Sequence, residues 1–343
     1  MNLMELLNSV LFFRILIFSR VANNFEAALF FLFFDFDRIQ KSTYYFYKNF
    51  YIKIKKIRNI CAANWEVSMA VIAISRQVAA LGDEISSAVA KKLGYKFINR
   101  QEIEKRIVEL GFSADKLKKY DEKKPGFFAS LVKDRDEYLN YLQTAVLEAA
   151  QDGNCILIGR GAFVILENLP NLISLRLVAK EEIRIKRLMN EFSWNEKQAL
   201  QRINESDTNR KGFHKSFFNI EIDEPSHYLM VMNTGAFDVE SASDTIVAIE
   251  KSLINPEKEA EGKKRLEELL KCQHLVNKLI FDYKLNIEFL RAVIQDNNLI
   301  LQGVADSLVL VERAVKIAAS ELPEYNVTSS ISIVQDYKAH LQV

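Results

Sequence analysis

One stretch near residue 75 constrains the fold of this chain more than any other: an apolar run leads through a short loop into an amphipathic segment. Residues 71–74 are four consecutive apolar residues, which is typical of a strand buried on both faces of a parallel sheet. Residues 84–93 carry apolar side chains at helical spacing, and Gly94 follows where a helix would end. A loop that enters a helix in this way directs backbone N–H groups toward one point, where an anion can bind. The stretch therefore predicts a phosphate-binding loop between a strand and a helix.

The loop departs from the usual phosphate-binding pattern, in which the last Gly is followed by Lys and then by Ser or Thr. Gly82 is present, but Asp83 stands at the position of the Lys and Glu84 at that of the hydroxyl residue. At about 4 Å and an effective dielectric constant of about 20, this change turns an attraction of roughly 4 kcal/mol into a repulsion of similar size. The sequence therefore supports the fold more strongly than the catalytic activity.

Composition limits the class of protein. The chain has 343 residues, of which 49% are hydrophobic and 27% charged, and this balance predicts two soluble domains. A net charge of +1 provides no field that would attract nucleic acid, so we expect no nucleic-acid partner. The three cysteines are far apart and form no C-x-x-C pair, which favours small buried side chains over disulfides or a zinc site. We therefore predict a cytoplasmic protein and assign no metal-ligating residues.

Residues 1–68 differ from the rest of the chain. They contain 11 of the 23 Phe but neither Gly nor Pro, which a folded segment of this length normally uses in its turns. Their apolar runs are too short to span a bilayer. Three interpretations stay open: an over-extended start before Met69, an aromatic membrane-surface anchor beside the basic run at 53–58, or a helical extension.

Strand and helix patterns alternate from residue 69 to residue 255, interrupted by a charged interval at 113–124 that ends in Pro125-Gly126. The further strands are predicted at 95–100, 155–158, 172–178 and 228–234. The further helices are predicted at 101–110, 138–150, 180–192, 195–205 and 241–254. This alternation predicts an α/β domain with a doubly wound parallel sheet, whose ligands bind beyond the carboxyl ends of the strands.

A candidate anion-binding residue follows the strand at 155–158. Arg160 is flanked by Gly159 and Gly161, so its guanidinium can offer two parallel hydrogen bonds to a phosphate while the glycines let a ligand approach the backbone. The alternative is a structural Arg that pairs with a local carboxylate.

Two predicted helices carry further cations. Arg184 and Arg187 lie on the helix at 180–192, and Arg210 follows the helix at 195–205. Two such helices joined by a short turn would form a lid that closes positive charge over a phosphoryl group. A solvated charged face is the alternative.

The order of these motifs over residues 70–250 resembles the cytidylate kinase-like family of P-loop nucleoside-monophosphate kinases. The matching motifs are ISRQ at 74–77, AKKLG at 90–94, IGRG at 158–161, RIKR at 184–187, DTNR at 207–210, DEPSHY at 223–228 and NT at 233–234. The resemblance implies that the γ-phosphoryl group of ATP is transferred, with Mg²⁺, to CMP or dCMP.

The resemblance also implies roles for individual residues. The catalytic residues would be Arg184, Arg187, Arg210 and Asp207. The residues that bind the ATP cofactor would be Ser75, Arg76, Gln77, Ala80, Leu81, Gly82, Asp83 and Glu84. The substrate would be bound by Asn99, Arg100, Gly159 and Arg160. Family loops carry Gly-Ser-Gly-Gly and then Arg or Lys, where this chain has Ala79-Ala80-Leu81-Gly82-Asp83, so a pseudokinase that senses nucleotides or acts as a scaffold is the alternative.

Residues 256–343 predict a second, smaller α+β domain. The charged run at 256–264 is either a linker or the solvated start of a helix at 265–281. Strands at 286–294, 299–304 and 326–334 and a helix at 308–320 are predicted to follow. A helix packed on a three-stranded sheet, with residues 299–307 at its centre, resembles a BON domain, which implies a membrane, lipid or protein partner. A generic α+β dimerisation domain is the alternative, and the pattern predicts no particular oligomeric state.

Overall fold

The computed structural model describes residues 70–118 and 132–334, which belong to one compact unit. The interpretations of residues 1–68, the later part of the charged interval at 113–124 and Pro125-Gly126 lie outside the described residues. Within the two described ranges, no helix has both the length and the apolar character that crossing a membrane requires.

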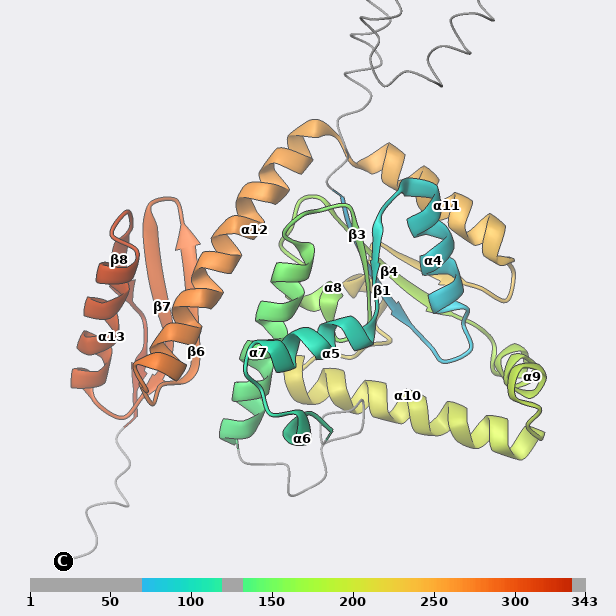
Figure 1. Cartoon of the computed structure of the whole chain (residues 1–343), viewed down its shortest axis with the longest axis horizontal. Helices are drawn as coiled ribbons and strands as arrows, with labels where there is room; N and C mark the ends of the chain where they lie inside the picture. Colours follow the sequence, from blue (N-terminus) through green and yellow to red (C-terminus); the bar gives the residue numbers. More distant parts are fainter. Residues whose placement is uncertain (1–69, 119–131, 335–343) are drawn as a thin grey trace, which may run out of the picture. The chain divides into compact units, whose positions relative to one another are not determined.

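The central sheet has five parallel strands in the order β2-β3-β1-β4-β5 (Figure 1). The strands are β1 (Val71–Arg76), β2 (Lys96–Ile98), β3 (Cys155–Ile158), β4 (Leu172–Val178) and β5 (Met230–Asn233). In the middle of β1, Ile72 is in register with Ile156 of β3 on one side and with Ile173 of β4 on the other. The predicted doubly wound parallel sheet is confirmed.

Helices cover both faces of this sheet. The helices of this part are α4 (Gly82–Leu93), α5 (Arg100–Glu109), α6 (Ala114–Leu117), α7 (Val132–Ala150), α8 (Ala162–Ile165), α9 (Glu181–Phe192), α10 (Glu196–Phe218), the short η2 (Pro225–His227) and α11 (Val239–Leu253). Helices α4 and α11 share a core with Ile72 and Ile74, whereas α5, α7, α8 and α10 share the opposite core with Val71 and Ala73. Residues 71–74 of β1 are therefore buried on both faces, which explains their uninterrupted apolar sequence.

Helix α10 is longer than predicted. Asn195 begins it with a capping box, because its side chain accepts a hydrogen bond from the N–H of Gln198 and its own N–H donates to the Gln198 side chain. The helix then continues to Phe218 and ends at Asn219, whose φ of 55° lies in the left-handed region. The predicted end at residue 205 is wrong, so the motif at 207–210 lies inside the helix and its side chains are held by helical geometry.

The carboxyl-terminal part forms a second, four-stranded sheet with two helices. Its elements are α12 (Pro256–Asn277), the π-helical turn η3 (Lys278–Asp282), β6 (Glu288–Gln295), β7 (Asn298–Ala305), α13 (Leu308–Glu321), β8 (Asn326–Ser329) and β9 (Ser332–Ile333). Strand β7 pairs antiparallel with β6 and parallel with β8 and β9. The predicted three-stranded sheet is wrong. The predicted strand at 326–334 is divided into β8 and β9 at Ser330, whose N–H donates a hydrogen bond to the carbonyl of Leu301.

The charged run at 256–264 is part of α12, so of its two interpretations the solvated start of a helix is confirmed. Asn255 caps this helix by accepting a hydrogen bond from the N–H of Lys258 at 2.9 Å. Pro256 occupies the first helical position, where a proline loses no helical hydrogen bond. The division of the chain into domains near residue 256 stays a prediction.

Candidate functional site

The loop after β1 keeps a backbone shape that usually needs glycine. Ala79 and Leu81 have φ values of 59° and 56°, in the left-handed region, where a residue with a side chain is less stable by about 1–2 kcal/mol. These are two of the positions where the family resemblance expects Gly. Leu81 is the N-cap of α4, so the N–H groups of the first turn of α4 are directed out of the helix end toward the mouth of the loop.

Two arginines of α9 hold the loop by its carbonyl groups. Arg184 donates from Nε to the Val78 carbonyl at 2.9 Å and from its two terminal nitrogens to the carboxylate of Asp207, also at 2.9 Å. Arg187 donates to the Ala79 carbonyl at 3.0 Å. The Arg184 side chain is only 4% exposed. Both arginines therefore position the loop, and their catalytic roles, like that of Asp207, stay predictions.

Acidic side chains occupy the first turn of α4. Asp83 and Glu84 are both exposed. Burial lowers the pKa of the Arg187 guanidinium, and the charge of Glu84 opposes this shift. The first turn of α4, which follows the loop, thus carries two exposed negative side chains.

Other predicted cofactor-binding residues support the sheet. Ala80 is fully buried in the core under α4. The Gln77 side-chain oxygen accepts a hydrogen bond from the N–H of Ala179 at 3.1 Å, which fixes the end of β1 beside that of β4. These contacts connect the loop to the strands that carry it.

A cleft of about 410 Å³ opens beside the loop, between the start of α4 and the start of α5. Its lining residues are Arg76, Asp83, Asn99, Arg100, Gln101 and Glu104. Four of these six were predicted to bind cofactor or substrate, and the structure brings them together. Asn99 is fixed in place as the N-cap of α5, because its side chain accepts a hydrogen bond from the Glu102 N–H at 3.1 Å.

The Arg76 side chain passes from the loop to the end of β3. A Cβ on Gly82 would lie 2.6 Å from Cγ of Arg76, and a Cβ on Gly159 would lie 2.6 Å from its Nη1. Gly159 also has a φ of 83°, followed by 52° at Arg160 and 69° at Gly161. Gly159 is therefore needed both for the backbone turn and for the path of Arg76, and Gly82 for the path of Arg76.

Arg160 lies behind the cleft, with a side chain only 1% exposed. It forms an ion pair with Glu104, and its guanidinium lies 5.8 Å from the centre of the Phe213 ring. Burial and repulsion from Arg100 and Arg76 lower the pKa of Arg160 to about 9, so the group is still charged at neutral pH. The pairing with a local carboxylate, which was the alternative for this residue, is thus present, and its ligand-binding role stays a prediction.

Arg176 is a buried cation of the site that sequence reasoning missed. It donates to the Ser75 hydroxyl at 2.9 Å and forms an ion pair with Asp223, whose other carboxylate oxygen lies 2.8 Å from Nζ of Lys211. The sequence could have indicated a role for this residue, because Arg176 is the one charged residue in the mostly apolar segment 172–178. A small cavity of about 30 Å³ is lined by Arg76, Gln77, Arg176, Asp207, Arg210, Lys211, Ile222 and Asp223. Arg210 therefore lines this cavity, and its catalytic role stays a prediction.

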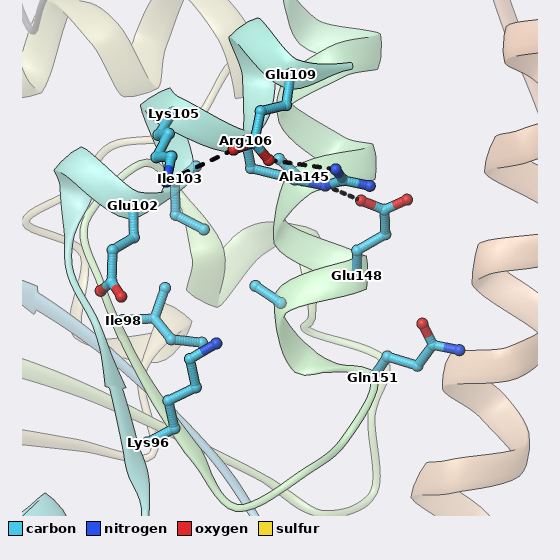
Figure 2. A pocket seen from close by; sticks show the side chains of 11 residues that line it. Lys96, Ile98, Glu102, Ile103, Lys105, Arg106, Glu109, Ala145, Glu148 and Gln151 are labelled. Carbon is cyan, nitrogen blue, oxygen red and sulfur yellow. Dashed lines mark hydrogen bonds and ion pairs between the residues drawn. The ribbon is translucent and has the colours of Figure 1, made fainter.

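A second hollow, of about 430 Å³, lies between α5, α7 and the start of β2 (Figure 2). Its charged groups pair with one another: Arg106 Nε lies 2.7 Å from a carboxylate oxygen of Glu148, and Lys105 Nζ lies 3.7 Å from one of Glu109. It is lined by Lys96 and Ile98 of β2, and no residue of the loop after β1 lines it. None of the predicted site residues lines this hollow, and we assign the site to the cleft beside the loop.

The described part of the chain contains no cluster of three or more His, Cys, Asp or Glu side chains arranged to hold a metal ion. Burial raises the pKa of the Cys155 thiol to about 12 and that of Cys272 to about 11, so both thiols are protonated at neutral pH. Both therefore behave as small buried side chains.

Part of this chain is similar in sequence to known proteins. Residues 71–236 match the sequence profile of the Cytidylate kinase-like family. A cytidylate kinase of Methanocaldococcus jannaschii is 28% identical over 141 residues, which cover 40% of this chain and 72% of that protein. A cytidylate kinase of Methanococcus maripaludis strain C5 is 31% identical over 130 residues, which cover 37% of this chain and 71% of that protein. Among solved structures, an uncharacterized protein from Eubacterium ventriosum superposes with a TM-score of 0.43 at 22% identity, over 54% of this chain and 99% of that one. Through its residues 71–236, this chain belongs to the cytidylate kinase-like family.

Proposed function

We propose that this chain binds the phosphate group of a nucleoside monophosphate, CMP or dCMP, in the cleft beside the loop, and that its donor side supports transfer of the ATP γ-phosphoryl group only weakly. The observation that carries the proposal is the contrast between the two halves of the site. Arg76 and Arg100 line the cleft and Arg160 lies behind Glu104, whereas the first turn of α4 carries Asp83 and Glu84.

The acceptor half is assembled for an anion. Arg100 and Arg160 both contact the carboxylate of Glu104, and Arg76 lies close enough to lower the pKa of Arg160. Guanidinium groups bind phosphate with two parallel hydrogen bonds, so a phosphate in this position would find donors already in place. The choice of CMP or dCMP rests on the relatives, which are named as cytidylate kinases.

The donor half fits ATP in its backbone but not in its charge. Ala79 and Leu81 keep the left-handed backbone that directs N–H groups toward a phosphate. Asp83 replaces the cation expected on the β- and γ-phosphates, and its repulsion outweighs what backbone donors alone contribute. Bound ATP would supply the transferable phosphoryl group, and bound Mg²⁺ would neutralise its charge. In this chain the Asp83 and Glu84 carboxylates in the first turn of α4 would be the residues to hold Mg²⁺.

An active kinase is the second candidate, and the left-handed backbone at Ala79 and Leu81 favours it. A chain that no longer binds ATP has no need to keep two residues with side chains in a costly conformation. In this case Asp83 and Glu84 would help to bind the Mg²⁺ that accompanies ATP.

If the protein is only weakly active, the carboxyl-terminal sheet would provide a scaffolding role through a membrane, lipid or protein partner. The sequence of this part resembles a BON domain.

Calorimetry with CMP and, separately, with ATP and Mg²⁺ tests the proposal. We expect wild type to bind CMP and to bind ATP weakly. Arg160→Ala should weaken CMP binding by at least about tenfold, since a charge-assisted hydrogen bond contributes about 1.5–3 kcal/mol. Arg202→Ala is the matched control, because Arg202 is half exposed on α10 and only approaches Glu205 at 4.0 Å.

Because Arg160 is buried, its variant is compared at a temperature where circular dichroism shows it folded. A folded wild type that gives no heat with CMP would refute the acceptor assignment. Rapid transfer from ATP to CMP by wild type would replace the proposal with the second candidate.

A further inference from the structure

We propose that the Glu104 carboxylate is an internal substitute for the acceptor phosphate. The carboxylate occupies the anion position between Arg100 and Arg160 and leaves it when a phosphate monoester binds. This inference rests on the proposed function, because it concerns the same cleft. It makes Glu104 a residue that selects among anions, a role that no sequence motif suggested.

The contacts of Glu104 define the anion position. One of its carboxylate oxygens lies 2.6 Å from Nε of Arg100 and also pairs with Nη2 of Arg160. A single oxygen is thus shared by two guanidinium groups from different elements, α5 and the turn after β3. This is the arrangement in which a phosphate oxygen would be held.

Glu104 also stands between the open cleft and the buried arginine. It lines the cleft of about 410 Å³ with a side chain that is 21% exposed, and it contacts Arg160, which is 1% exposed. Arg160 also lines a small cavity of about 10 Å³, together with Ser75, Gly159 and Phe213. Rotation of the Glu104 side chain toward solvent would therefore open Arg160 to the cleft.

The movement belongs to the side chain and not to the helix. Helix α5 is fixed at its start by the capping box between Asn99 and Glu102. Its apolar face is anchored by Ile103 and Ile107, which are buried in the core under the sheet. Glu104 therefore changes its contacts by changing rotamer, at a cost much smaller than that of moving α5.

The exchange favours ligands with two charges. A carboxylate carries one negative charge, whereas a phosphate monoester carries about 1.5 to 2 at neutral pH. Arg76, Arg100 and Arg160 together attract the ligand with the greater charge more strongly, so a monoester displaces Glu104 and a singly charged anion does not. Glu104 therefore sets a threshold that a phosphate diester or a carboxylate fails to pass.

The test compares Glu104→Gln with wild type in calorimetry with two probes, inorganic phosphate and CMP. Gln keeps the size of the side chain but removes its charge, so we expect both probes to bind at least tenfold more tightly. The matched control is Glu109→Gln on the same helix, where Glu109 contacts Lys105 and Arg106 away from the cleft. This control should bind both probes like wild type. Formate, a singly charged anion, should bind to Glu104→Gln but not to wild type.

The neutral variant loses an ion pair to a buried arginine, so its folding is checked by thermal melting with and without phosphate. If it does not melt cooperatively, Glu104→Asp replaces it. Asp keeps the charge but is shorter by one methylene, and we expect it to bind phosphate more tightly than wild type.

Unchanged or weaker phosphate binding by both variants would overturn the inference, because it would mean that Glu104 only holds the arginines in place. The two proposals fail separately. Tighter phosphate binding without any CMP binding would sustain the role of Glu104 and refute the nucleotide assignment. CMP binding that depends on Arg160 but not on Glu104 would sustain the nucleotide assignment and refute the role of Glu104.

Discussion

Arg184 of α9 donates from both terminal nitrogens of its guanidinium to the two carboxylate oxygens of Asp207 on α10, at 2.9 Å each. Its remaining nitrogen, Nε, donates to the carbonyl of Val78 in the loop at 2.9 Å. One side chain thus connects two helices to the loop that follows β1. The position of the loop therefore depends on an ion pair that lies outside it.

Replacing the carboxylate of this pair should loosen the loop. We expect Asp207→Asn to reduce the free energy of unfolding by about 1.5–3 kcal/mol, because Arg184 is nearly buried and loses its charged partner. Glu205→Gln, two residues away in an exposed pair, should cost less than about 0.5 kcal/mol. Urea unfolding of both variants measures the difference. Equal costs would show that the pair does not anchor the loop.

Comparing two glycines with similar backbone conformations distinguishes the cost of backbone strain from a change in the geometry of the site. Gly94 and Gly159 have φ values of 72° and 83°, so replacing either by Ala should cost about 1–2 kcal/mol in stability. A Cβ on Gly94 meets nothing within 4 Å, whereas one on Gly159 would lie 2.6 Å from Nη1 of Arg76 and displace it. We therefore expect Gly159→Ala, but not Gly94→Ala, to lose affinity for CMP in calorimetry. Equal affinities would show that Arg76 does not contact the ligand.

The charge at the start of α4 can be restored by substitution. Asp83→Lys combined with Ala79→Gly and Leu81→Gly should bind ATP with Mg²⁺ at least about tenfold more tightly than wild type, since it supplies both the cation and an unstrained loop. Ala79→Gly with Leu81→Gly alone is the control that isolates the backbone contribution. Calorimetry with ATP measures both. The contrary result, CMP phosphorylation by wild type that Asp83→Ala suppresses, would assign Asp83 to Mg²⁺ binding.

Asp223 makes part of the stability depend on pH. Burial raises the pKa of this carboxyl, but hydrogen bonds and charges from Lys211 and Arg176 outweigh it and hold the pKa below the ordinary value of 3.8. A carboxyl with a lowered pKa stabilises the folded state above its unfolded pKa, and this contribution is lost as the pH falls through its folded pKa.

We therefore expect Asp223→Asn to lower the melting temperature at pH 7 and to have little effect near pH 2. Thermal melts of variant and wild type from pH 7 to pH 2 should converge in the acid range. A difference in melting temperature that stays constant from pH 7 to pH 2 would show that the ion pairs of Asp223 do not cause the difference.

Local patterns in the sequence were sufficient for the elements of the sheet. The strands at 155–158 and 172–178 were predicted with the bounds that the structure has, because a strand buried on both faces is mostly apolar. The sequence also predicted that the loop with Gly82 and the turn with Arg160 lie at the same edge of the sheet, since the carboxyl ends of parallel strands meet there. Helix α10 shows the limit of such patterns: the polar segment after residue 205 looks like a turn, but Phe213 and Phe217 are buried in the core and keep it helical.

What each charged residue does was decided by the tertiary structure alone. The sequence identified Arg184, Arg187 and Arg160 as cations near a phosphate, but two of them hold the loop by its carbonyl groups and the third pairs with Glu104, 56 residues away. Arg176 and Asp223, 47 residues apart, were not connected by any pattern. Apolar periodicity reports which face of an element is buried, and this is a local property. An ion pair depends on the distance between two side chains after the strands have taken their order in the sheet, and that distance exists only in the folded chain.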